Sequence, residues 1–234
     1  QIEGIDKNKF TNIENAISTI KKNVELIEKK LDCIFKDLTI IIDNFNYSCI
    51  NISGSKRLNG SQVLKENIFY ILNSLKSEIS ENEKNKTILH IFNSKSVLDG
   101  VSVGNLPIGL FGNFYNHELT FFLIGNNDLK NIKQVFNKSN LEVKKIILKS
   151  FSEGTQLINQ NNTETFFKIN INKKTSNISF FEKSSFRYSE QFSFGTDVIF
   201  KDIEKICSIN YEIIENFLLN NLNDIKKFDD KEFL

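Results

Sequence analysis

The stretch NDLKNIKQVFNKSNLEVKKIILKS, residues 127–150, decides the fold that the sequence predicts. Its first part repeats apolar residues at the spacing of a helix, and its second part, residues 141–150, is a short apolar run typical of a strand. Residues 11–43 have the same order of helix and strand. We therefore predict one α/β domain whose two helix–strand units are separated by an inserted module.

The N-terminal helix–strand unit carries the clearest local signals. Thr11 to Glu14 match a capping box, which predicts the start of a helix. Residues 38–43, LTIIID, are apolar, β-branched and too few for a helix, so we expect a buried parallel strand. The apolar residues expected on the inner face of the helix are Ile13, Ala16, Ile17, Ile20, Val24, Ile27 and Leu31.

The inserted module is predicted at residues 47–124, as a small α+β unit that has its own face to bury. Its helix has one apolar face, formed by Leu64, Ile68, Ile71, Leu72, Leu75 and Ile79. The strands and loops are expected in this order: a strand at 47–60 ending in the turn Asn59–Gly60, the helix, a strand at 87–93, a glycine-rich loop at 94–113 and a strand at 118–124.

The part of the chain beyond residue 158 begins with a change of composition. Residues 159–165, NQNNTET, are polar and are interpreted as a linker. The elements expected after it are a hairpin at 167–181, FKININKKTSNISFF, a third strand at 186–194, helices at about 198–207 and 209–222, and a charged, loosely ordered tail.

The totals exclude several classes of protein. The 234 residues are 40% hydrophobic, which is a globular composition with a real core. The net charge of +1 gives no overall field for nucleic acid or for an anionic membrane. The longest apolar run, residues 38–42, is too short to span a bilayer, and no signal peptide opens the chain. The sequence begins with Gln1 rather than Met, so we expect part of a longer polypeptide.

Few residues of this sequence suggest catalytic or metal chemistry. His90 and His117 have no Asp, Glu or Cys at ligand spacing, so both are interpreted as structural histidines. Three cysteines, odd in number and far apart, indicate neither disulfides nor zinc and fit a reducing cytoplasm, and Cys33 is expected to be buried. No nucleophile elbow and no glycine-rich nucleotide motif occurs. We predict that the chain is not an enzyme.

The segment YSEQFSFGTDVIFKDIEKICSINYEIIENFL, residues 188–218, resembles the bacterial cell-division protein FtsA, an actin homologue. The matching positions include Gly195, Thr196 and Asp197, where a strand enters a helix. Shorter pieces follow in the family's order: VLDG (97–100), PIGL (107–110), NKSNLEVKKIILKSFSEG (137–154) and NISFFEKSSF (177–186).

The resemblance to FtsA implies an actin-like, ribonuclease-H-like α/β fold that is interrupted by an SHS2-type insert. The implied domains are a partial subdomain 1A at 1–46 and 125–158, the insert at 47–124, and part of a second subdomain at 159–234. The implied function is a scaffold at the inner face of the cell membrane at the division site. There, FtsA binds FtsZ and other division proteins, self-associates, and reaches the membrane through a segment that would follow residue 234.

The hairpin departs from the FtsA pattern where the family binds ATP with magnesium. The resemblance places phosphate-loop positions at Asn170, Asn172, Lys173, Lys174, Thr175 and Ser176, with Gly195, Thr196 and Asp197 beside them. Side chains have replaced the glycines that let a backbone approach phosphate closely, and Asn170 replaces an aspartate. We therefore expect no ATP, no other cofactor and no metal on this chain. The alternatives are an ATP-dependent enzyme of the actin and sugar-kinase superfamily and a pilus-assembly actin homologue.

Overall fold

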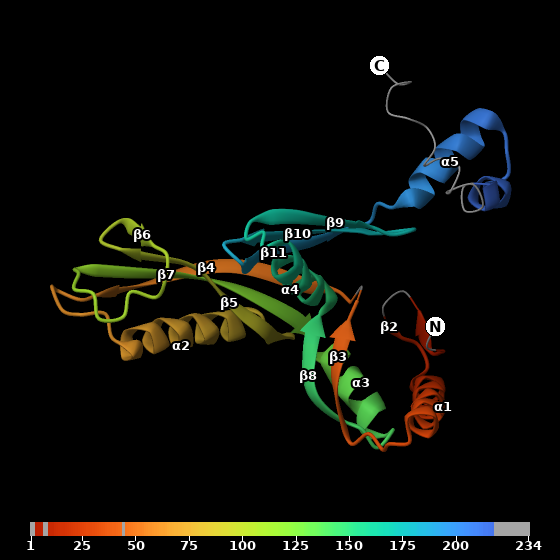
Figure 1. Ribbon diagram of the computed structural model, residues 1–234, viewed down its shortest axis with the longest axis horizontal. Helices are drawn as coiled ribbons and strands as arrows, with labels where there is room; N and C mark the ends of the chain where they lie inside the picture. The colour runs from red at the N-terminus through yellow and green to blue at the C-terminus, as the bar shows by residue number, and fades with distance from the viewer. Residues whose placement is uncertain (1–2, 7–8, 44, 218–234) are drawn as a thin grey trace. The chain divides into compact units, whose positions relative to one another are not determined.

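The computed structural model describes residues 3–6, 9–43 and 45–217 (Figure 1). The elements along the chain are β1 (Ile5–Asp6), β2 (Lys9–Phe10), α1 (Ile13–Leu31), β3 (Asp37–Ile42), β4 (Tyr47–Arg57), α2 (Lys65–Asn82), β5 (Lys86–Leu98), β6 (Val101–Val103), β7 (Phe114–Gly125), α3 (Asn126–Asn137), β8 (Glu142–Leu148), α4 (Lys149–Asn161), β9 (Phe166–Ile171), β10 (Ser176–Glu182), β11 (Ser185–Phe192) and α5 (Thr196–Cys207).

The chain divides into two compact units. The first contains Gln1–Phe167 and Ser179–Ser189, and the second contains Lys168–Ile178 and Glu190–Leu234. The domain boundaries expected from the sequence stay a prediction, because two spatially compact units do not show which segment is an insert within a domain. Within the described residues, no helix is both long and apolar enough to cross a membrane.

The two predicted helix–strand units meet through their strands. β3 and β8 form a parallel pair, with Ile40 opposite Ile146 and Ile42 opposite Leu148. The expectation that β3 is buried was wrong, because only Ile42 is buried and Ile41 is 56% exposed. Among the described residues β3 and β8 form a two-stranded sheet, so β3 is an edge strand and not the central strand of a parallel sheet that is covered on both faces.

Helix α1 follows its predicted face for only part of its length. Its N-cap is Asn12 and not Thr11, because the Asn12 side chain accepts a hydrogen bond from the Asn15 N–H at 3.0 Å. The first half of the helix packs on α3 and the loop that follows it, but Ile27 and Leu31 are exposed. The predicted inward role of these two residues was wrong, since the buried cluster around Val135 does not extend to the end of the helix.

The inserted segment forms an antiparallel sheet in the order β4-β7-β5-β6, and α2 covers one of its faces (Figure 1). Ile71, Leu75 and Ile79 of the predicted helix face are buried there. The predicted turn at Asn59–Gly60 is confirmed, with φ of 54° and 80°. The predicted loop at 94–113 was partly wrong, because β5 continues to Leu98 and β6 lies within that range.

Strand β7 supplies side chains to two cores. Tyr115, Leu119 and Phe121 pack with α2 on one face. Phe122 and Ile124 belong to a second core on the other face, whose further buried residues are Ile42, Ile132, Ile146, Leu148, Phe181 and Phe186. These five β7 side chains are almost completely buried. Side chains alternate between the faces of a strand, so burial on both sides explains the nearly continuous apolar run ELTFFLI.

Helix α4 was not predicted, and it takes up residues 159–161 of the expected linker. The segment is mostly polar, so the sequence did not indicate that Gly154 is buried against the ring of Phe181. That ring stacks on Phe166 at 4.9 Å and on Phe186 at 4.7 Å between centroids. Phe181 therefore holds α4 to the base of the hairpin.

The C-terminal elements follow the expected order. The two strands of the hairpin and the third strand form a sheet in the order β11-β10-β9. Helix α5 corresponds to the helix predicted at about 198–207. Residues 211–217 are helical, as part of the predicted helix at 209–222. The rest of that helix and the predicted tail lie outside the described residues.

We predict that Gly154→Ala lowers the free energy of unfolding by about 1–3 kcal/mol. A Cβ there would lie 1.9 Å from Cζ of Phe181, whose ring is fully buried and stacks on Phe186. Urea denaturation measures the change. Gln156→Ala, an exposed position on the same helix, is the matched control and should change the value by less than about 0.5 kcal/mol. Equal values for the two variants would contradict this packing.

Candidate functional site

The candidate site is the turn between β9 and β10, at the place of the family's phosphate loop. The N–H of Asn172 donates to the carbonyl of Thr175 at 2.9 Å and closes the turn. Ser176, which is buried, donates its hydroxyl hydrogen to the carbonyl of Phe194 at 2.7 Å. The turn is therefore fixed by its own backbone and by the segment before α5.

The N-terminus of α5 is bonded to this turn. The N–H of Thr196 donates to the carbonyl of Asn172 at 3.1 Å, and the N–H of Asp197 donates to the carbonyl of Lys173 at 2.9 Å. The first N–H groups of a helix have no partner within the helix and commonly bind anions. Here two of them have partners from the turn.

The approach of the turn to α5 depends on Gly195. A Cβ on this buried residue would lie 2.4 Å from the carbonyl oxygen of Asn172 and 2.5 Å from that of Lys173. Any larger residue would displace backbone atoms that form the two hydrogen bonds. Gly195 therefore has a packing role that its place in the sequence motif alone did not reveal.

The ammonium group of Lys173 is engaged by the helix that follows α5. Its Nζ lies 2.7 Å from Oε1 of Glu215 and 5.1 Å from the ring centroid of Tyr211. The hydrogen bond to Glu215 raises the pKa of Lys173 above its usual value. Tyr211 in turn donates its hydroxyl hydrogen to Oδ1 of Asp197. The four side chains form one connected network.

All nine residues predicted for the site lie in the second compact unit. The structure brings Asn172 and Lys173 together with the segment from Gly195 to Asp197. Of the other four positions, Thr175 and Ser176 form the hydrogen bonds of the turn described above. Asn170 lies within β9, and Lys174 is exposed in the turn. Tyr211 and Glu215 were not predicted, because nothing local indicates that residues about 40 positions away reach the turn.

Metal and nucleophile chemistry find no support in the described part of the chain. No group of three or more His, Cys, Asp or Glu residues there could hold a metal ion. Cys33 is exposed, so its predicted burial was wrong; Asp32 ends α1 in a left-handed conformation and directs the chain away from the helix face. Burial raises the pKa of the Cys49 thiol, which favours the unreactive protonated form.

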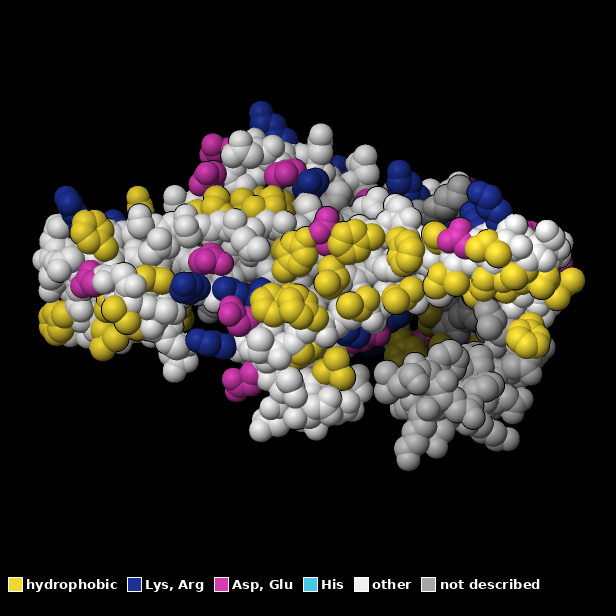
Figure 2. Space-filling view, turned by 90° about the horizontal axis from the view of Figure 1, so that it is seen from above, with side chains coloured by type: hydrophobic (Ala, Val, Ile, Leu, Met, Phe, Trp, Pro, Cys, Tyr) yellow, Lys and Arg dark blue, Asp and Glu magenta, His cyan; other side chains and the backbone are white. Residues whose placement is uncertain are grey.

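Both histidines lie in the sheet of the inserted segment. His117 is 1% exposed on β7, and neither ring nitrogen has a hydrogen-bond partner among the described residues. His90 accepts a hydrogen bond from the N–H of Leu148 at 3.4 Å. Burial lowers the pKa of each ring below its usual value, so the neutral form predominates at pH 7. No histidine side chain is visible on the face drawn in Figure 2.

Comparisons with known proteins agree with the resemblance. The chain is 23% identical over 227 residues to cell division protein FtsA of Buchnera aphidicola subsp. Schizaphis graminum, covering 97% of this chain and 54% of that protein. FtsA of Borreliella burgdorferi is 19% identical over 216 residues, covering 91% and 52%. The chain spans about half the length of these curated relatives. No protein-family model matches the sequence.

The fold is shared with a chain of the PilM-PilN type IV pilus biogenesis complex. The TM-score is 0.57 at 6% identity, over 92% of this chain and 58% of that one. The predicted actin-like α/β fold is confirmed, and so is the likeness to FtsA in sequence. The SHS2 type of the insert stays a prediction.

We predict that Gly195→Ala speeds hydrogen exchange of the α5 amides by at least about tenfold, because it separates the turn from the helix. Mass spectrometry of residues 196–207 measures the rate. Gly104→Ala, where a Cβ would meet no atom within 4 Å, is the matched control and should leave these amides unchanged. Unaltered exchange in Gly195→Ala would show that the bonded turn does not hold the helix.

Proposed function

We propose that this chain is part of an FtsA-type cell-division scaffold, which acts through contacts with other proteins and not by turning over ATP. The similarity to FtsA over 97% of the chain supports the division role. The chain represents about half of such a protein, so the role of the whole molecule is included in this proposal.

The observation that supports a scaffold rather than an ATPase is the closed turn between β9 and β10. Its carbonyls bond the first N–H groups of α5, and Glu215 neutralises Lys173. A phosphate-binding loop needs free N–H groups that point at the ligand and backbone that can come close to it. Opening this turn for phosphate would break both hydrogen bonds and the ion pair.

The partners proposed are FtsZ and other division proteins, together with further copies of the same chain. The location proposed is the cytoplasmic face of the bacterial membrane at the division site, reached indirectly or through another segment. A pilus-assembly role is the second candidate, because the fold is shared with PilM. At 6% identity that likeness concerns the fold alone, whereas the sequence similarity points to FtsA.

We predict no measurable binding of Mg-ATP to this chain. Isothermal titration calorimetry with an intact actin-like ATPase as positive control measures it. The physical reason is that three side chains, at Asn172, Lys173 and Lys174, stand where glycine would permit close approach to phosphate. A micromolar dissociation constant would contradict the absence of nucleotide chemistry and would favour the enzyme alternative.

We also predict that the chain co-sediments with polymerised FtsZ from its own organism and does not bind a PilN-type peptide. Sedimentation with and without GTP separates polymer-dependent recovery from simple aggregation. The closed turn is not needed for this contact, so Gly195→Ala should sediment like the original sequence. Binding to the peptide without binding to FtsZ would move the proposal to pilus assembly.

A further inference from the structure

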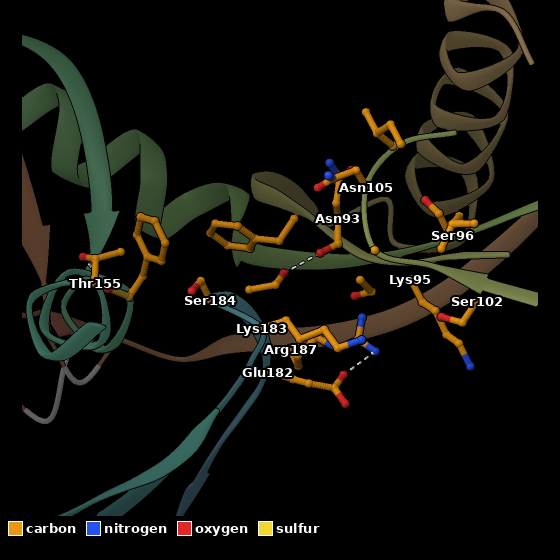
Figure 3. A pocket seen from close by; sticks show the side chains of 17 residues that line it. Asn93, Lys95, Ser96, Ser102, Asn105, Thr155, Glu182, Lys183, Ser184 and Arg187 are labelled. Carbon is orange, nitrogen blue, oxygen red and sulfur yellow. Dashed lines mark hydrogen bonds and ion pairs between the residues drawn. The ribbon is translucent and has the colours of Figure 1, made fainter. Parts of the chain in front are cut away.

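A feature of the first compact unit that the proposed function does not explain is a cavity of about 590 Å³. Its walls come from three separate parts of the chain: β5 with the segment after β6, helix α4, and the turn between β10 and β11 (Figure 3). The volume is in the range of small-molecule sites. None of the residues discussed for the phosphate-loop turn lines it.

The charge of the lining is predominantly positive. Lys95, Lys183 and Arg187 line the cavity, against the single carboxylate of Glu182. The two lysines have no ion-pair partner among the described residues. An anion entering the cavity would therefore meet uncompensated positive charge from two sides.

Arg187 is the most constrained of these groups, with a side chain only 14% exposed. Its Nη2 lies 3.1 Å from Oε2 of Glu182 and 3.7 Å from Oε1 of Glu118. Its Nη1 is buried and has no hydrogen-bond partner in the described part of the chain. A buried guanidinium nitrogen without an acceptor is unusual, and an oxyanion in the cavity would supply one.

The turn that carries Lys183 is held in an unusual conformation. Lys183 and Ser184 both have positive φ, 49° and 63°, which fits a type I′ turn that normally selects Asn and Gly. The N–H of Lys183 donates to the hydroxyl oxygen of Thr165 at 3.1 Å, and the N–H of Ser184 donates to the carbonyl of Glu164 at 2.8 Å. Strained backbone of this kind gathers at binding sites, and here it places both residues in the cavity wall.

The rest of the lining favours a ligand that has an apolar part in addition to a charged group. Phe92 and Phe151, whose ring centroids are 4.7 Å apart, form an apolar part of the lining. Ser102 and Asn105, both labelled in Figure 3, add hydrogen-bond donors and acceptors to the lining. Small-molecule sites combine apolar walls with a few polar groups in this way.

From these observations we propose that the cavity binds a small molecule that carries a phosphate or carboxylate group. The oxyanion lies at Nη1 of Arg187, with Lys95 and Lys183 adding charge. The proposal concerns a site separate from the phosphate-loop turn, and it stands whether or not the chain acts in cell division.

The test is a titration of the whole chain with inorganic phosphate and, separately, with citrate, at constant ionic strength in chloride. The amides of residues 183–187 and the Arg187 guanidinium are followed by NMR. Both probes should shift these signals, and the tighter one identifies the phosphate or the carboxylate as the recognised group. Arg187→Gln should weaken binding by at least about tenfold, because it removes a charge-assisted hydrogen bond.

Two further variants test the site even if Arg187→Gln does not fold. Lys95→Gln and Lys183→Gln should each weaken binding about two- to fivefold. Lys130→Gln, an exposed position on α3 away from the cavity, removes the same charge and should leave binding unchanged. The proposal is overturned if neither probe shifts residues 183–187 at about 10 mM. An equal loss in Lys130→Gln would also overturn it, since binding would then follow net charge.

Discussion

Burial of both faces of β7 is the constraint on which the rest of the structure depends. A shift of one residue in its pairing with β4 or β5 would exchange the two faces and turn Tyr115, Leu119 and Phe121 away from α2. Full burial of each large apolar side chain stabilises the fold by about 1.5–3 kcal/mol. The register of the inserted sheet is therefore determined by β7, and both α2 and the second core are positioned on it.

The second core continues from β7 into the aromatic residues at the base of the hairpin. Phe122 stacks on Phe186 with centroids 4.4 Å apart, and Phe186 stacks in turn on Phe181. These contacts pack residues Ser179–Ser189, which contain the β10–β11 turn, within the first compact unit. The β10–β11 turn is thereby brought to the wall of the cavity. Packing far from any polar group thus decides where Lys183 and Arg187 lie.

The β9–β10 turn and the cavity differ in whether their positively charged groups have partners. In the β9–β10 turn, Lys173 has an acidic partner and the helix N–H groups have carbonyl partners, so the polar groups satisfy one another. In the cavity, Nη1 of Arg187 has no acceptor and Lys95 and Lys183 have no ion-pair partner among the residues that the structure describes. The position that resembles a ligand site in sequence is closed in the structure, and a position without any motif has the chemistry to receive one.

The sequence by itself determined the types and order of most elements, because hydrophobic periodicity depends on neighbours a few residues apart. It determined the helix–strand units at both ends of the insert, the hairpin at 167–181 and the absence of glycines from its turn. It did not reveal α4, whose buried Gly154 packs against the ring of Phe181, a residue distant in the sequence. The exposure of Ile27 and Leu31 also depends on where partner helices end. The partners of Lys173 and the walls of the cavity were decided only by tertiary structure, because those contacts join segments that are remote along the chain and carry no local pattern.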